Sequence, residues 1–185
     1  MSAYSFSQVV LRQQAQGQQP SIAMDSLSET VENESRYVFL SHSKLDNELA
    51  IGFCRLLEKS GVNVYIDLMD SQLTLPPNGE TANKLKKRIR GARQFILLAT
   101  ENSVSTSKWC QWEVGFADGV NVPVSIAVTS DGLHEWGAEY LETYPLLKMA
   151  TLTDKSRMGY AVVEPKFTSD GTYAGGTIKS WAEDW

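Results

Sequence analysis

Short apolar runs alternate with amphipathic segments through the middle of the chain, and this alternation predicts strands separated by helices. Four runs rich in β-branched or aromatic residues predict buried strands at residues 37–40, 62–66, 95–99 and 122–128. The intervening segments carry apolar side chains at helical spacing and predict helices within residues 43–61, 81–91 and 107–118. Strands that are apolar along their whole length are typical of a parallel sheet covered on both faces, so we expect an α/β fold.

Capping residues mark the ends of these predicted helices. Ser43 and Asp46 fit the S-x-x-D pattern of a helix start, and Ser107 is a second candidate N-cap. Gly61 follows the first helix, at the position where a residue with positive φ ends many helices. We expect that helix to bury a stripe made of Leu49, Phe53, Leu56 and Leu57.

The two ends of the chain are patterned less clearly. Residues 1–35 are rich in glutamine and polar side chains, so we expect a partly flexible N-terminal extension that packs a turn or two on a domain of residues 36–185. A segment that becomes ordered in an assembly is the alternative. Beyond the fourth strand, the sequence predicts a helix at 139–149 interrupted at Pro145, a fifth strand at 160–163, a turn at 169–171 and a terminal helix at 178–185.

The composition is that of one globular domain, with 42% hydrophobic residues among 185. No apolar run approaches the ~20 residues of a membrane-spanning helix, and the first residues do not resemble a secretory signal. Two cysteines, Cys54 and Cys110, do not make a disulfide framework, so we expect a cytoplasmic protein. A net charge of −5 argues against a nucleic acid partner, and we expect neither nucleic acid nor membrane binding.

Several common catalytic motifs are missing. The chain has no G-x-G-x-x-G, no phosphate-binding P-loop and no G-x-S-x-G nucleophile elbow. The histidines and cysteines lack the spacing of a zinc site, so we expect no metal. A run of basic side chains lies between Lys84 and Arg93, and we interpret it as the solvated face of the second helix. A partner surface or a phosphate-steering patch is the alternative.

The most informative pair of residues is Trp109 and Glu113 in the third predicted helix. Residues four apart on a helix lie one above the other, and helical side chains lean toward the N-terminus. The Glu113 carboxylate is therefore expected beside the Trp109 indole, near the crevice at the carboxyl ends of the strands. A surface glutamate on an amphipathic helix is the alternative.

A carboxylate beside a flat aromatic wall suits the cleavage of an N-glycosidic bond to a cationic heterocycle. That leaving group departs uncharged and needs no proton, while positive charge develops on the ribose, as in glycosidase transition states. One ionised carboxylate can stabilise this charge, so a second acidic group is not required.

The segment from Arg36 to about Pro145 resembles the Toll/interleukin-1 receptor (TIR) domain, specifically the stand-alone bacterial type. The resemblance depends on the order and spacing of several short motifs, which are Tyr37-Val38-Phe39-Leu40-Ser41-His42-Ser43 with Asp46, Gly61 with Val64-Tyr65-Ile66-Asp67, Glu80-Thr81-Ala82, Ala99-Thr100-Glu101-Asn102, Ser107-Lys108-Trp109, Trp112-Glu113-Val114-Gly115-Phe116 with Asp118-Gly119, and Glu139-Tyr140-Leu141 with Tyr144-Pro145. It implies a flavodoxin-like fold with a central parallel sheet of about five strands and helices on both faces.

The resemblance also implies a substrate, NAD⁺, and no further cofactor. Glu113 matches the catalytic glutamate of the family, and the residues that correspond to its NAD⁺ pocket are Phe39, Ser41, His42, Ser43, Lys44, Asp67, Leu68 and Trp109. Leu68 stands where bacterial relatives often carry a tryptophan. Lys44 would meet the pyrophosphate electrostatically, and a solvated surface lysine is the alternative.

Related bacterial domains act in anti-phage systems such as Thoeris, where they release nicotinamide and make a cyclic or modified ADP-ribose that triggers an effector protein. Many TIR domains are active as homo-oligomers, with contacts through the loop that corresponds here to Asp67–Gly79. The resemblance therefore implies an NAD⁺-consuming signalling enzyme. A non-catalytic TIR adaptor that acts by self-association and partner binding is the alternative from a different class.

Overall fold

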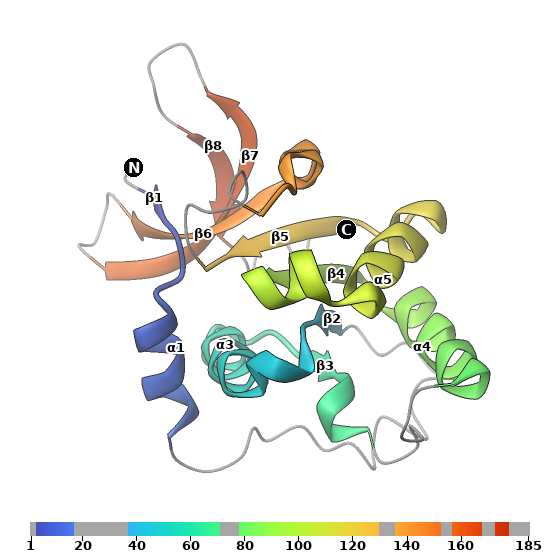
Figure 1. Ribbon diagram of the computed structural model, residues 1–185. Helices are drawn as coiled ribbons and strands as arrows, with labels where there is room; N and C mark the ends of the chain where they lie inside the picture. Colours follow the sequence, from blue (N-terminus) through green and yellow to red (C-terminus); the bar gives the residue numbers. More distant parts are fainter. Residues whose placement is uncertain are drawn as a thin grey trace.

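The computed structural model describes residues 3–16, 37–70, 78–129, 136–152, 157–167 and 173–177 (Figure 1). Its helices are α1 Gln8–Ala15, α3 Asn47–Lys59, α4 Gly79–Gly91 and α5 Lys108–Gly119. Its strands are β1 Ala3–Tyr4, β2 Val38–Ser41, β3 Val64–Ile66, β4 Gln94–Ala99, β5 Val124–Val128, β6 Leu146–Leu152, β7 Arg157–Phe167 and β8 Tyr173–Thr177. The predicted alternation of strands and helices is confirmed from β2 to β5.

The strands form one sheet in the order β3-β2-β4-β5-β6-β7-β8, and β1 pairs with β6. The five strands from β3 to β6 are parallel to one another, whereas β7 and β8 extend the sheet in antiparallel fashion. Numbered along the chain, the parallel strands have the order 2-1-3-4-5, which is the flavodoxin-like arrangement. The expected α/β class and its parallel sheet of five strands are confirmed.

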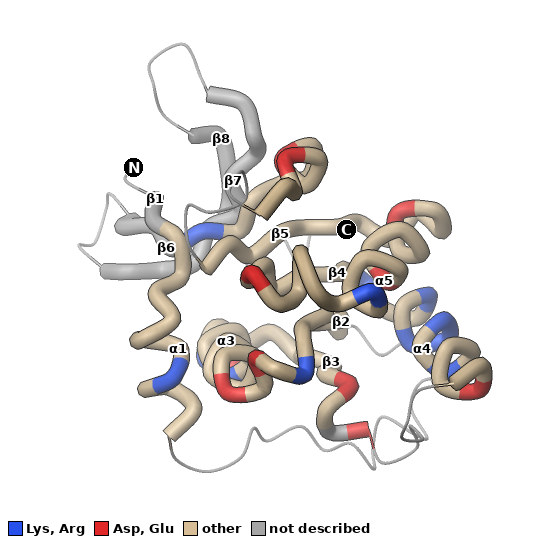
Figure 2. The backbone as a smooth tube through the Cα atoms, viewed as in Figure 1, with Lys and Arg blue, Asp and Glu red and all other residues tan. Residues whose placement is uncertain are grey.

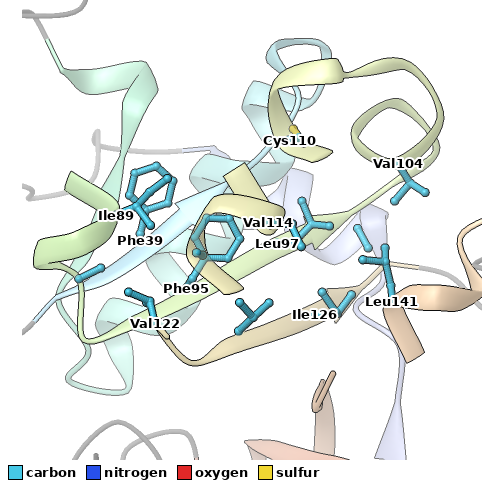
Figure 3. Close-up of a cluster of buried hydrophobic side chains, with 14 of the residues drawn as sticks. Phe39, Ile89, Phe95, Leu97, Val104, Cys110, Val114, Val122, Ile126 and Leu141 are labelled. Carbon is cyan, nitrogen blue, oxygen red and sulfur yellow. The ribbon is translucent and has the colours of Figure 1, made fainter. Parts of the chain in front are cut away.

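Each face of the sheet packs against its own pair of helices, because successive side chains of a strand point to opposite faces. α4 and α5 cover one face, where Phe39, Phe95 and Leu97 contribute to the core (Figure 3). α1 and α3 cover the other face, and the predicted stripe of α3 is buried there. Full burial of one large apolar side chain stabilises the fold by roughly 1.5–3 kcal/mol.

The N-terminal segment is part of this second face. Phe6 and Leu11 are fully buried, and the Phe6 ring meets Phe53 of α3 edge to face at 4.9 Å between ring centroids. α1 approaches α3 so closely that a Cβ atom at Gly52 would lie 1.9 Å from the Leu11 carbonyl oxygen. A glycine at position 52 therefore allows α1 to pack here.

Most of the predicted helix ends follow local chemistry. Gly61 has φ +80 after α3, as its position predicted, and the Ser107 hydroxyl accepts the Cys110 N–H at the start of α5. The second helix begins earlier than predicted, because Asn78 forms a capping box with Thr81.

The region after β5 corrects the sequence prediction. Residues 139–149 were expected to form an interrupted helix, but the chain makes a 3₁₀ turn at Glu139–Thr143 and then strand β6. The short apolar run after Pro145 pairs with β5 and becomes the fifth parallel strand. The strand expected at 160–163 lies within β7 and is antiparallel. The predicted turn at 169–171 and the predicted helix at 178–185 both lie outside the described residues.

Candidate active site

A cavity of about 560 Å³ opens at the carboxyl ends of the parallel strands. Its lining comes from the segments after β2, β3 and β4 and from α3, α4 and α5. It consists of His42, Ser43, Lys44, Leu45, Asn47, Asp67, Leu68, Asp70, Thr81, Leu85, Thr106, Ser107, Trp109 and Glu113. The order of strands reverses between β2 and β4, and flavodoxin-like sheets bind ligands in the crevice at this point. The fold therefore places the cavity where a ligand site is expected.

Glu113 lies in the wall of this cavity and is only 4% exposed. The Ser41 hydroxyl at the end of β2 donates a hydrogen bond of 2.5 Å to Glu113 Oε2, and so joins β2 to α5. Within the described part of the chain, no lysine or arginine forms an ion pair with this carboxyl group. A buried carboxyl group without a basic partner is costly to ionise unless a cation enters the cavity.

The protonation of Glu113 reflects this environment. Burial, together with the negative charge of Asp67, raises the pKa of the carboxyl group to about 8, and the hydrogen bond from Ser41 limits this rise. At neutral pH Glu113 is therefore mainly protonated when no cation lies beside it. A cationic ligand beside Glu113 would favour the carboxylate.

Three further polar residues in the cavity wall contact one another, namely Asn47, His42 and Asp67. The His42 side chain is 1% exposed, and its Nδ1 lies 3.4 Å from Asp67 Oδ1. This contact has ion-pair distance but not hydrogen-bond alignment, so Nδ1 makes no hydrogen bond to a described residue. His42 Nε2 lies 3.2 Å from Asn47 Oδ1, which fixes the orientation of the ring.

Buried hydrogen bonds hold two of the loops around the cavity. Asp46 was expected to help cap the first helix, but its carboxylate accepts hydrogen bonds from Thr100 Oγ1 at 2.6 Å and Asn102 Nδ2 at 2.9 Å. These bonds tie the segment after β2 to the segment after β4. The Ser43 hydroxyl does accept the Leu45 N–H, at 3.3 Å.

Most of the residues predicted for the site lie together. Trp109 and Glu113 both line the cavity from α5, and they are joined there by His42, Ser43, Lys44, Asp67 and Leu68. Ser41 contacts Glu113 rather than lining the cavity. Phe39 is not brought to the cavity, because its ring stacks between Tyr65 and Phe95 in the core at centroid distances of 5.1 and 5.4 Å.

The structure adds lining residues that sequence reasoning missed. Asn47, Thr81 and Leu85 face the cavity from the starts or inner faces of α3 and α4. Asp70 anchors the segment after β3, since it accepts a hydrogen bond of 2.7 Å from the Tyr65 hydroxyl and pairs with Arg88 at 3.3 Å. The topological rule that ligands bind beyond strand ends was the one available signal for them.

The run of basic side chains lies along α4. Figure 2 shows lysine and arginine gathered along α4, whose Leu85 and Ile89 side chains are buried. Lys86 and Arg90 lie 6.0 and 5.0 Å from the Phe116 ring of α5, in cation–π geometry.

Among the residues that the structure describes, no three His, Cys, Asp or Glu side chains are grouped to hold a metal ion. None of the described helices is long and apolar enough to cross a membrane.

The structure thus combines a flavodoxin-like α/β sheet with a buried carboxyl group in a cavity beyond the strand ends. The sequence profile of the TIR domain matches residues 38–142, and the chain belongs to the TIR domain family. It is also similar to a curated protein of Bacillus cereus (strain MSX-D12) named "Probable 3' cyclic ADP-D-ribose synthase ThsB'". The two are 32% identical over 125 residues, which are 65% of this chain and 64% of that relative. The chain thus matches less than two thirds of the relative's length.

Proposed function

We propose that this protein cleaves the bond between nicotinamide and ribose in NAD⁺, with Glu113 as the catalytic residue. One observation carries the proposal: a buried carboxyl group, with no described basic partner, lines a cavity beside an indole. Such a site favours a ligand that is both cationic and flat, and the nicotinamide ring of NAD⁺ is both.

The proposed reaction uses both the aromatic face of Trp109 and the carboxylate of Glu113. Trp109 offers an aromatic face to the charged ring, and the positive charge of the ring favours the ionised form of Glu113. The carbon–nitrogen bond then breaks, and its electron pair stays on nicotinamide, which leaves uncharged. The Glu113 carboxylate stabilises the positive charge that develops on the ribose.

The name of the Bacillus relative supports the finer part of the proposal. A cyclic product arises when a group within the same molecule captures the ribosyl cation, and hydrolysis to ADP-ribose arises when water does. We propose an ADP-ribose or cyclic ADP-ribose-type product that signals to a downstream effector in bacterial anti-phage immunity of the Thoeris kind. We also propose a cytoplasmic homo-oligomer with contacts through Asp67–Gly79, of which residues 71–77 lie outside the described part.

The test is incubation of concentrated protein with NAD⁺, with nicotinamide measured by chromatography and the other product by mass. Wild type should release nicotinamide, while Glu113→Gln should lose nearly all activity and remain folded. Glu101→Gln, at an exposed glutamate, is the matched control and should keep wild-type activity. Equal turnover by the Glu113 variant would remove this residue from the mechanism. No turnover by wild type under assembling conditions would favour the adaptor.

A further inference from the structure

The cavity holds a second carboxylate that the cleavage step does not use. Asp67 lines the same cavity as Glu113, and its charge is close enough to act on that carboxyl group. Its side chain is 24% exposed, so it can reach a ligand, whereas Glu113 is almost fully buried. The site therefore has a buried carboxyl group and an accessible one, which can take different roles.

His42 gives Asp67 the surroundings of a proton acceptor. His42 Nε2 pairs with Asn47 Oδ1, so the ring proton of a neutral histidine belongs on Nε2 and the lone pair remains on Nδ1. This lone pair lies 3.4 Å from Asp67 Oδ1. Nδ1 makes no hydrogen bond to a described residue, so its lone pair is available as an acceptor. A proton that reaches Asp67 therefore finds a second acceptor atom nearby in His42.

The chemistry after cleavage requires such an acceptor. When a hydroxyl group captures the ribosyl cation, an oxygen lone pair forms the new carbon–oxygen bond and the oxygen becomes positively charged. Its proton must then leave, whether the hydroxyl belongs to water or to another part of the same substrate. Among the carboxyl groups of the described cavity wall, Glu113 accepts the Ser41 hydroxyl and Asp70 is held by Tyr65 and Arg88. Asp67 is the remaining carboxylate that can receive this proton.

We propose that Asp67, oriented by His42, is the general base that removes the proton from the hydroxyl group that captures the ribosyl cation. This inference deepens the proposed function and depends on it. Asp67 is a catalytic residue in this scheme, and His42 is a positioning residue that shares the accepted proton before it passes to solvent.

The general-base role of Asp67 can be tested by comparing two ways in which the ribosyl cation is captured. Isotope-labelled nicotinamide added to the reaction captures the cation through its ring nitrogen and gives labelled NAD⁺. No proton has to leave in that exchange, whereas each hydroxyl-derived product requires one proton transfer. The ratio of hydroxyl-derived products to labelled NAD⁺ therefore reports the general base alone.

The experiment measures both products by mass for wild type and Asp67→Asn. We expect the variant to retain exchange within a few-fold of wild type, while hydroxyl-derived products fall by about 100-fold or more, the usual effect of losing a general base. An equal loss of both products, or no change in their ratio, would overturn the proposal. If wild type forms neither product, the proposed function itself fails.

Two further variants test whether a change in the product ratio has a structural cause. Glu101→Gln alters an exposed carboxylate that does not line the cavity and should leave the ratio as in wild type. His42→Gln keeps Asp67 but removes the shared proton site, and should lower the ratio by about tenfold, less than the loss of the base itself. A normal ratio in His42→Gln would exclude the positioning role, and thermal unfolding of each variant verifies that it is folded.

Discussion

Replacing Glu113 with glutamine should change how the stability of the folded protein depends on pH. Because burial raises the pKa of Glu113 from 4.5 to about 8, the native state binds this proton more tightly than the unfolded chain. The stabilisation from the bound proton is fully present below the unfolded pKa and is lost as pH rises through the folded pKa. Glutamine at this position cannot ionise, so the variant lacks this loss.

The magnitude follows from the two pKa values. At about 1.4 kcal/mol per pH unit, the interval from 4.5 to about 8 corresponds to roughly 5 kcal/mol, of which about 3 kcal/mol is lost by pH 7. A change of 1 kcal/mol shifts the melting temperature of a domain of this size by about 2–4 °C. Between pH 4.5 and 8.5 the melting temperature of Glu113→Gln should therefore rise relative to wild type by roughly 10–20 °C.

The assay is thermal unfolding of both proteins across this pH range, followed by circular dichroism. Comparison with wild type at each pH removes the contribution of titrating groups that do not interact with Glu113. Glu101→Gln, at an exposed position, should run parallel to wild type throughout. Parallel curves for Glu113→Gln and wild type would show that the Glu113 carboxyl group ionises as easily in the folded protein as in the unfolded chain, and would refute the reasoning.

Three other predictions concern turnover and packing. If the ionised form of Glu113 acts on the substrate, kcat/KM for NAD⁺ should fall about tenfold per pH unit below an apparent pKa of about 8, and a flat profile from pH 6 to 9 would contradict this. Ser41→Ala removes the hydrogen bond that opposes the rise in the pKa of Glu113, so the midpoint of that profile should move to higher pH; an unmoved midpoint would show that the bond has no influence. Gly52→Ala places a methyl group against the Leu11 carbonyl oxygen and should destabilise the domain by about 1–3 kcal/mol in urea unfolding. Gly115→Ala, in an open part of α5, is its control and should be neutral or stabilising by about 0.5–1 kcal/mol.

Local patterns were sufficient to predict much of the fold. The buried stripe of α3, the positive φ of Gly61 and the capping by Ser107 depend on residues a few positions apart, so the sequence expresses them directly. The helix predicted at 139–149 was wrong because local patterns were the only basis for it. Its short apolar run has no decisive period, and pairing with β5 made it a strand.

The order of the strands depends on contacts that no local pattern contains. Each core strand is a short apolar run, and nothing within the run states which neighbour it will join. The strand order reverses between β2 and β4, and this reversal creates the crevice. The fold, and no local pattern, therefore determines the position of the cavity.

The sequence by itself determined the class of fold and, through the resemblance to TIR domains, the residues most worth examining at the site. Only the tertiary structure decided how those residues meet. It joined Ser41 to Glu113 across 72 positions of the chain, set Asp67 beside His42, and placed Phe39 in the core. The physical reason is that helices and turns arise from short-range interactions. A buried carboxyl group and its altered pKa arise from side chains that become neighbours only when the sheet and its helices pack together.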